Sequence, residues 1–255
     1  MSTIRPAVSA EEAKRIAKSY EEMAYRLYEE RLFNHPLILG MKDGTTPDYQ
    51  IKGFLLNWYT FAQEVNTAAS TIYHRFISWF KVHRELEELT LDVIAEEFSH
   101  PGPGGHIRTI QRTCEAAGLT LDEIVHAKLV PEARAWVDFH VRLLTEGTLA
   151  ETAADFICEG AFGHFAKILF EVLTTRYGFT RQSADYFREH YEADAVGTED
   201  KLPHGERGTL MLQALLEEGM LEERTGWGVE YTIDITVSMF ELLLDGILRR
   251  YPVEG

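Results

Sequence analysis

The chain has 255 residues, of which 45% are apolar and 26% are charged, and its formal net charge is −16. A chain of this size and composition buries a substantial core, which excludes a disordered protein and a fibrous repeat. The negative charge disfavours nucleic acid and anionic membranes as partners, so we expect a small-molecule substrate. The sequence lacks both the run of about 20 apolar residues that spans a membrane and the apolar core of a signal peptide. It therefore predicts a cytoplasmic protein and leaves a homodimer open.

Helix-favouring residues dominate the chain, and no alternation of strands and helices is visible. Ser9 is a favoured N-cap and predicts a first helix that ends before Pro36. A second helix is predicted to begin at 46–48, with Pro47 in its first turn, and to run through an aromatic-rich stretch to Phe80. Further helices are predicted at 84–99, from 106, and at 120–127, 132–144, 149–177, 181–196, 205–221 and 232–251. The fold class is therefore all-α, a compact seven-helix bundle that forms a single domain over residues 1–255.

Glu159 lies in the segment 156–173, which is otherwise nearly all apolar. A buried carboxylate is costly unless a partner compensates its charge, so Glu159 is expected to face a cation or a metal ion. An ion pair with an arginine is the alternative.

Two further patterns place carboxylates near imidazoles. His190 and Asp194 are four residues apart and share one face of a helix, where they form either a metal site or a salt-bridging stripe. Glu96 and Glu97 end a helix just before a Pro/Gly loop, and His106 opens the next helix; the alternative is a solvated acidic helix end.

Together these segments supply oxygen and nitrogen ligands without thiolates, which is typical of iron or manganese held between helices. Cys114 and Cys158 show no CxxC pairing and are expected to be reduced, buried thiols. No dinucleotide-binding, Walker, HExxH or GxSxG motif competes with this interpretation. The sequence predicts a metal centre that activates oxygen.

The chain resembles the superfamily of thiaminase II, the PQQ-synthesis protein C and the heme-oxygenase-like diiron oxidases. The resemblance runs from about residue 50 to 215. HIRTIQRTCEAAGLTLDEI (106–124) looks like the helix of that family that begins with a metal-binding histidine, and VPEARAWVDFH (130–140) and YFREHYEAD (186–194) resemble segments of the PQQ-synthesis branch. The resemblance implies a heme-oxygenase-like bundle.

In the oxidase branch the final helix carries the pattern His-x3-Asp-x2-His. Position 197 of this chain is Gly, so the last histidine is missing, and His204 or Glu64 is expected to replace it. Glu96 competes with Glu97 because the loop length varies. The implied metal ligands are Glu97, His106, Glu159, His190, Asp194 and His204, and Glu97, Glu159 and His190 are the implied catalytic residues.

The resemblance implies a non-heme oxidoreductase with two Fe(II) ions per chain, the second of them labile, and O2 as co-substrate. The expected substrate is an amino acid, amine or fatty acid of specialised metabolism, changed by desaturation, N-oxygenation or oxidative C–C cleavage. Trp58, Phe61 and Phe162 are expected to keep water away from the site, besides packing the core.

Three alternatives remain open. A cofactorless oxidase similar to the PQQ-synthesis protein C would need a cavity rich in Arg, Lys and Tyr. A thiaminase-like hydrolase would need a cysteine that faces the cavity, but Cys158 is expected to point about 100° away from Glu159 around the helix. A noncatalytic interaction protein would bind no iron.

Overall fold

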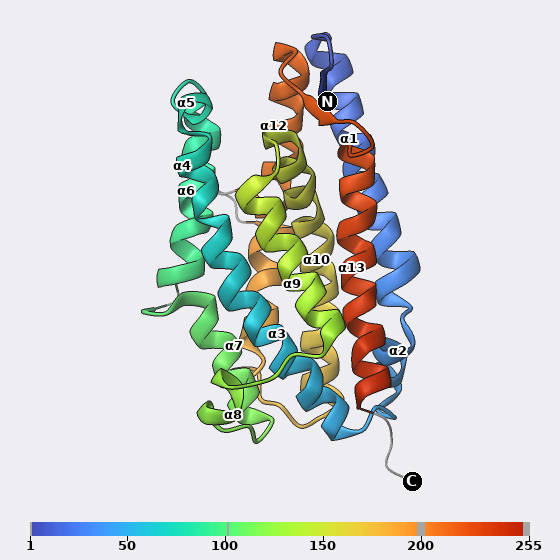
Figure 1. Cartoon of the computed structure of the whole chain (residues 1–255). Coiled ribbons are helices and arrows are strands. Elements are labelled where there is room, and N and C mark those ends of the chain that lie inside the picture. Colours follow the sequence, from blue (N-terminus) through green and yellow to red (C-terminus); the bar gives the residue numbers. More distant parts are fainter. Residues whose placement is uncertain (1, 101, 198–201, 252–255) are drawn as a thin grey trace.

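The computed structural model describes residues 2–100, 102–197 and 202–251. Most of them are helical, which confirms the predicted all-α class. The long helices, which run along a common direction in Figure 1, are α1 (Ala10–Leu27), α3 (Asp48–Ala69), α6 (Arg84–Ser99), α7 (Gly105–Ala116), α9 (Pro131–Glu146), α10 (Leu149–Arg176), α12 (His204–Glu218) and α13 (Val229–Arg250).

The described residues hold more helices than the predicted seven, because several segments are broken into short pieces. These are α2 (Pro36–Asp43), α4 (Thr71–Arg75), α5 (Ile77–Phe80), α8 (Leu121–Val125), α11 (Asp185–His190) and the π-helical segments η1 (Tyr28–Phe33) and η2 (Tyr191–Val196). The sequence predicted no strand, but β1 (Ser2–Ile4) pairs antiparallel with β2 (Glu222–Arg224). Helices α5 and α8 lie at opposite ends of the bundle (Figure 1).

The helix predicted to run unbroken from 46–48 to Phe80 ends instead at Ala69. The hydroxyls of Ser70 and Thr71 donate hydrogen bonds to the carbonyls of Thr67 and Ala68, so they compete with helical backbone bonding there. The guanidinium of Arg75 then binds the carbonyls of Leu144 and Gly147 at the end of α9. The chain is thus tied to α9 before it turns toward α6.

Helix α10 is the central element of the bundle and packs against α1, α12 and α13. A capping box fixes its start, because Thr148 and Glu151 each accept a hydrogen bond from the other's backbone N–H. Every residue from Ala150 to Cys158 is buried. Within the described residues, no helix is long and apolar enough to cross a membrane.

Candidate metal centre and substrate cavity

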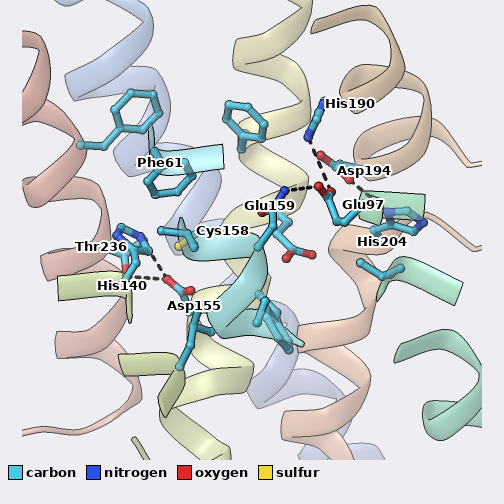
Figure 2. A pocket seen from close by; sticks show the side chains of 18 of the residues that line it. Phe61, Glu97, His140, Asp155, Cys158, Glu159, His190, Asp194, His204 and Thr236 are labelled. Carbon is cyan, nitrogen blue, oxygen red and sulfur yellow. Dashed lines mark hydrogen bonds and ion pairs between the residues drawn. The ribbon is translucent and has the colours of Figure 1, made fainter. Parts of the chain in front are cut away.

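A cavity of about 110 Å³ lies inside the bundle between α3, α6, α9, α10 and α13. Its wall is rich in aromatic side chains, which are Tyr28, Trp58, Phe61, Trp136, Phe156, Phe162, Tyr186 and Phe240. Carboxylates and imidazoles interrupt this wall, and several of them meet at one end of the cavity (Figure 2). No lysine or arginine is among the described residues that line it.

Glu97, His106 and His190 form the first donor group, with one candidate ligand atom of each lying within 4.8 Å of the others. His106 Nδ1 lies 2.9 Å and His190 Nε2 3.8 Å from Oε1 of Glu97. Asn66 of α3 donates a short hydrogen bond to the other oxygen of Glu97. Three residues that the sequence singled out thus meet in space.

The charges in this group depend on one another. Burial favours the neutral form of Glu97, but the ring of His106, followed by His190 and His204, lowers the carboxyl pKa to about 2. Burial likewise opposes the charged form of His106, yet Glu97 raises its pKa to about 9. At neutral pH the pair is a carboxylate and an imidazolium. A divalent cation would replace the proton on His106, because metal ligands must be deprotonated.

His190 is held in the tautomer that a metal site requires. Its Nδ1 lies 2.8 Å from the carbonyl oxygen of Tyr186, which accepts a hydrogen bond and cannot donate one. The proton is therefore on Nδ1, and Nε2 turns a lone pair toward Glu97. Burial and the charged ring of His106 lower the pKa of His190, which keeps it neutral.

Two glycines build the turn that sets His106 beside Glu97. Gly104 and Gly105 have φ of +94° and +50°, a region that disfavours other residues. A Cβ on Gly105 would lie 2.0 Å from the carbonyl oxygen of Glu97, so only glycine allows this approach. We call residues 92–100 and 102–106 the α6–α7 corner.

Asp92, Glu96 and His204 form a second group with ligand atoms within 4.8 Å of one another. Oε2 of Glu96 lies 3.3 Å from Nε2 of His204, whose Nδ1 lies 3.2 Å from Oδ1 of Asp194. The structure thus places both Glu96 and Glu97 at candidate ligand positions, one in each group. The sequence offered them as alternatives and did not single out Asp92.

Close helix packing brings His204 to this position. A Cβ on Gly205 would lie 2.4 Å from Cα of Gly160, and a Cβ on Gly208 would lie 2.4 Å from the backbone nitrogen of Ile157. The start of α12 therefore rests directly on the backbone of α10. We call this contact of Gly205 and Gly208 with α10 the α10–α12 seam.

Glu159 faces the cavity and forms an ion pair with an arginine, which was the alternative to a metal ion in the sequence-based prediction. Nη2 of Arg207 donates to both carboxylate oxygens, at 2.7 and 2.9 Å. Burial raises the pKa of Glu159 to about 7, with Arg207 opposing this shift and Asp194 adding to it. The pairing of Glu159 was not predictable because Arg207 is 48 residues away in sequence.

Two other residues differ from expectation. Glu64 does not line the cavity; its carboxylate binds Arg134 on the outer side of α3, at 2.9 and 2.6 Å. Glu189, which no sequence pattern singled out, lies behind the first group with Oε2 3.9 Å from Nε2 of His106. That buried oxygen has no hydrogen-bond partner among the described residues. Its position just before His190 is the signal that could have identified it.

Cys158 lines the cavity, contrary to the expectation that it points away from it. The cavity is wide enough around α10 that Asp155, Cys158 and Glu159 all reach its wall. Burial, with the charges of Asp155 and Glu159, raises the pKa of the Cys158 thiol well above its usual value. Cys114 is buried away from the cavity, and burial raises its pKa to about 12.

The sequence matches the TENA/THI-4/PQQC family over residues 22–162, more than half of the chain. This stretch holds Glu97, His106 and Glu159, whereas His190, Asp194 and His204 lie beyond it. No protein of curated function is significantly similar in sequence.

Several solved structures share the fold. A domain of unknown function with a heme oxygenase-like fold from Shewanella denitrificans aligns with a TM-score of 0.65 at 12% identity, over 92% of each chain. A TenA homolog from Pseudomonas syringae gives 0.61 at 14% identity, over 98% of this chain and all of its own. A putative TenA-like thiaminase from Sulfolobus solfataricus gives 0.59 at 12% identity, over 91% and 95%. These likenesses confirm the heme-oxygenase-like bundle.

Proposed function

The chain belongs to the TENA/THI-4/PQQC family, and from this premise we propose that it is a non-heme diiron oxidase that uses O2 to oxidise a small molecule. The observation that carries the proposal is two groups of carboxylates and imidazoles, from which Glu97, His190 and His204 reach the wall of one aromatic cavity. Both groups combine carboxylate oxygens with imidazole nitrogens, the mixture that suits iron.

The residues present fit two metal ions. Glu97, His106 and His190 would hold the first, and Asp92, Glu96 and His204 the second. Asp194 faces Nδ1 of His204, where it would orient the ring whose Nε2 faces Glu96. Glu159 would add a further oxygen ligand, since each carboxylate oxygen keeps a lone pair beyond its bond to Arg207. The orphaned Oε2 of Glu189 behind His106 would accept a hydrogen bond from Nε2–H of the ring once an ion occupied the site, as carboxylates behind metal-bound histidines do.

Iron ions bound here would supply the binding and reduction of O2. The chain's own residues would do the rest. The carbonyl of Tyr186 orients His190, and Asn66 orients Glu97. While no ion is bound to it, Glu159, whose pKa is about 7, would hold or release a proton at the cavity wall near neutral pH. The rings of Trp58, Phe162 and their neighbours would exclude water.

Anaerobic titration with ferrous iron, monitored by calorimetry, tests the metal site. After treatment with a chelator, the protein is expected to take up two ions per chain. His190→Ala should lose at least one of them, while His126→Ala, which removes an exposed imidazole, should change nothing. Wild-type protein that binds no iron would overturn the proposal.

Oxygen consumption tests the chemistry. Glu159→Ala and His190→Ala should abolish iron-dependent O2 uptake while helical circular dichroism stays close to that of the wild type. If both variants keep their O2 uptake, the reaction takes place elsewhere.

A thiaminase-like hydrolase is the second candidate, and the position of Cys158 on the cavity wall favours it. Its raised pKa keeps the thiol protonated and a poor nucleophile, which ranks this function second. Thiamin hydrolysis that needs no iron, and that Cys158→Ser abolishes but Cys114→Ser does not, would favour the hydrolase.

A further inference from the structure

A second polar group lies at the other end of the cavity from Glu97. It consists of His140 on α9, Asp155 on α10 and Thr236 on α13, each of them more than nine-tenths buried. Figure 2 shows this group and the candidate metal ligands on opposite sides of Cys158. Asp155 precedes Glu159 by one helical turn, so the two carboxylates share a face of α10 and lie about 6 Å apart along its axis. None of the three residues belongs to the proposed iron site.

The group presents hydrogen-bond acceptors to the cavity. Thr236 donates its hydroxyl proton to Oδ1 of Asp155 at 3.0 Å, and Nε2 of His140 lies 3.5 Å from the same oxygen. Nδ1 of His140 lies 2.9 Å from the carbonyl of Trp136 and must carry the ring proton, so a neutral ring has its lone pair on Nε2. Oδ2 of Asp155 has no hydrogen bond to any residue that the structure describes.

The cavity around this group suits a cation. The lining includes four carboxylates and, among the described residues, no lysine or arginine. Arg207, whose charge reaches Asp155, is bound to Glu159, so an anionic ligand at this end would have no lysine or arginine on the cavity wall to contact. The faces and edges of Phe61 and Trp136 surround His140, with ring centroids 5.2 and 5.6 Å away. Aromatic rings near a carboxylate are the usual surroundings of a bound ammonium.

We infer that His140, Asp155 and Thr236 bind the ammonium group of a short primary amine, which makes such an amine the substrate of the proposed oxidase. The three N–H donors of an ammonium match the acceptors of the Asp155 carboxylate, His140 Nε2 and the Thr236 hydroxyl. The carbon chain then lies along the aromatic wall toward Glu159. That this carbon end is oxidised rests on the proposed function, whereas the binding of the amine does not.

The size of the cavity limits the ligand further. A volume of about 110 Å³ is somewhat smaller than a cavity of roughly 150 Å³ that accepts benzene. An amine with a chain of a few carbons fits this space, whereas a long fatty acid does not. Of the three substrate classes that the sequence left open, the amine is the one that this site selects.

A purely structural role for the same residues is the competing explanation, since they connect α9, α10 and α13. The two roles differ in how they treat ligand charge. A structural role predicts that losing Asp155 weakens the binding of charged and neutral ligands alike. An ammonium site predicts that only the charged ligand suffers.

Calorimetry with three ligands of similar length, n-butylamine, 1-butanol and butyrate, separates these roles. Each ligand is titrated into full-length, iron-free protein in a buffer that contains a chelator. The wild type should bind butylammonium best and butyrate least. Asp155→Asn should weaken butylammonium by about 10- to 100-fold, the range for a lost hydrogen bond to a charged group, and leave 1-butanol unchanged. Asp122→Asn, whose side chain is 88% exposed, is the matched control and should behave like the wild type.

Several results would overturn the inference: equal butylammonium affinity in Asp155→Asn and wild type, a parallel loss of both ligands, or tighter binding of butyrate. If Asp155→Asn does not fold, Thr236→Val is the variant to measure. It should lower the preference for butylammonium over 1-butanol by a few-fold. An unchanged preference in this variant would overturn the inference. Because no iron is present, a failure here leaves the iron titration intact, and a failed iron titration leaves this site standing.

Discussion

The α6–α7 corner and the α10–α12 seam each present a glutamate to the same cavity, yet the two carboxyls differ in pKa by several units. At the corner, the pKa of Glu97 is lowered to about 2, because His106 and two further imidazoles outweigh the effect of burial. At the seam, the pKa of Glu159 is raised to about 7, because the effects of burial and of the Asp194 charge outweigh that of Arg207. Both glutamates line one cavity and each has a cationic partner, so the carboxylates beside Glu159, Asp194 above all, account for its higher pKa.

The difference has a functional meaning within the proposed oxidase. A carboxylate that is always ionised suits a permanent metal ligand, whereas a carboxyl that titrates near neutral pH suits proton exchange. The corner is built by a glycine turn from neighbouring residues of the chain, and the seam by glycines that let two distant helices touch. Substitutions at the corner, at the seam and at the exposed pair of Glu64 and Arg134 test this difference.

The largest effect is expected from Glu97→Gln in metal-free protein. His106 has a folded pKa of about 9 against an ordinary value of 6.5, so the pair stabilises the fold fully below the ordinary value and loses this contribution as pH rises through 9. The shift corresponds to about 3 kcal/mol, counted once for the pair. Urea unfolding at several pH values should show wild-type stability falling over this window.

In Glu97→Gln the same dependence should be absent, and its stability at neutral pH should be lower by a similar amount. A variant that keeps the wild-type loss of stability between neutral pH and pH 9 would show that His106 is charged by another group, with Glu189 the nearest candidate.

Gly205→Ala should break the seam and lower the free energy of unfolding by about 2 kcal/mol, because the new methyl group would meet the backbone of α10 and neither helix can yield. For a chain of this length the melting temperature should fall by about 4–8 °C. Gly160→Ala lies on the same contact, but its nearest neighbour would be 3.5 Å away. It should be neutral or slightly stabilising, and equal losses in both variants would mean that the close approach is not the cause.

The sequence predicted the corner better than the seam, for a physical reason. Glu97 and His106 are near neighbours in the chain, and the glycine-rich loop between them signals a tight turn. The expectation that His190, Asp194 and His204 converge on them came from the resemblance to a family, and the structure places them close together, although their role as iron ligands stays a prediction.

Long-range pairings were beyond the sequence. Nothing local in the segment around Arg207 indicates that it lies against Glu159, because that contact depends on a Gly–Gly approach of two helices. His140 and Asp155 lie in segments with the ordinary pattern of buried helices, so their convergence with Thr236 could not be predicted. The early end of α3 depends on hydroxyl–carbonyl bonds that a helical pattern does not reveal.

The smallest effect is expected from Glu64→Gln. Glu64 and Arg134 repeat the Glu–Arg chemistry of the seam outside the cavity, where the two side chains are 41% and 38% exposed, against 31% and 3% for Glu159 and Arg207. Water already solvates both charges, so the loss of this pair should cost less than about 1 kcal/mol in urea unfolding. Iron uptake should stay at two ions per chain, because the carboxylate binds Arg134 and belongs to neither donor group. A drop to one ion in this variant would show that Glu64, rather than His204, completes the second iron site.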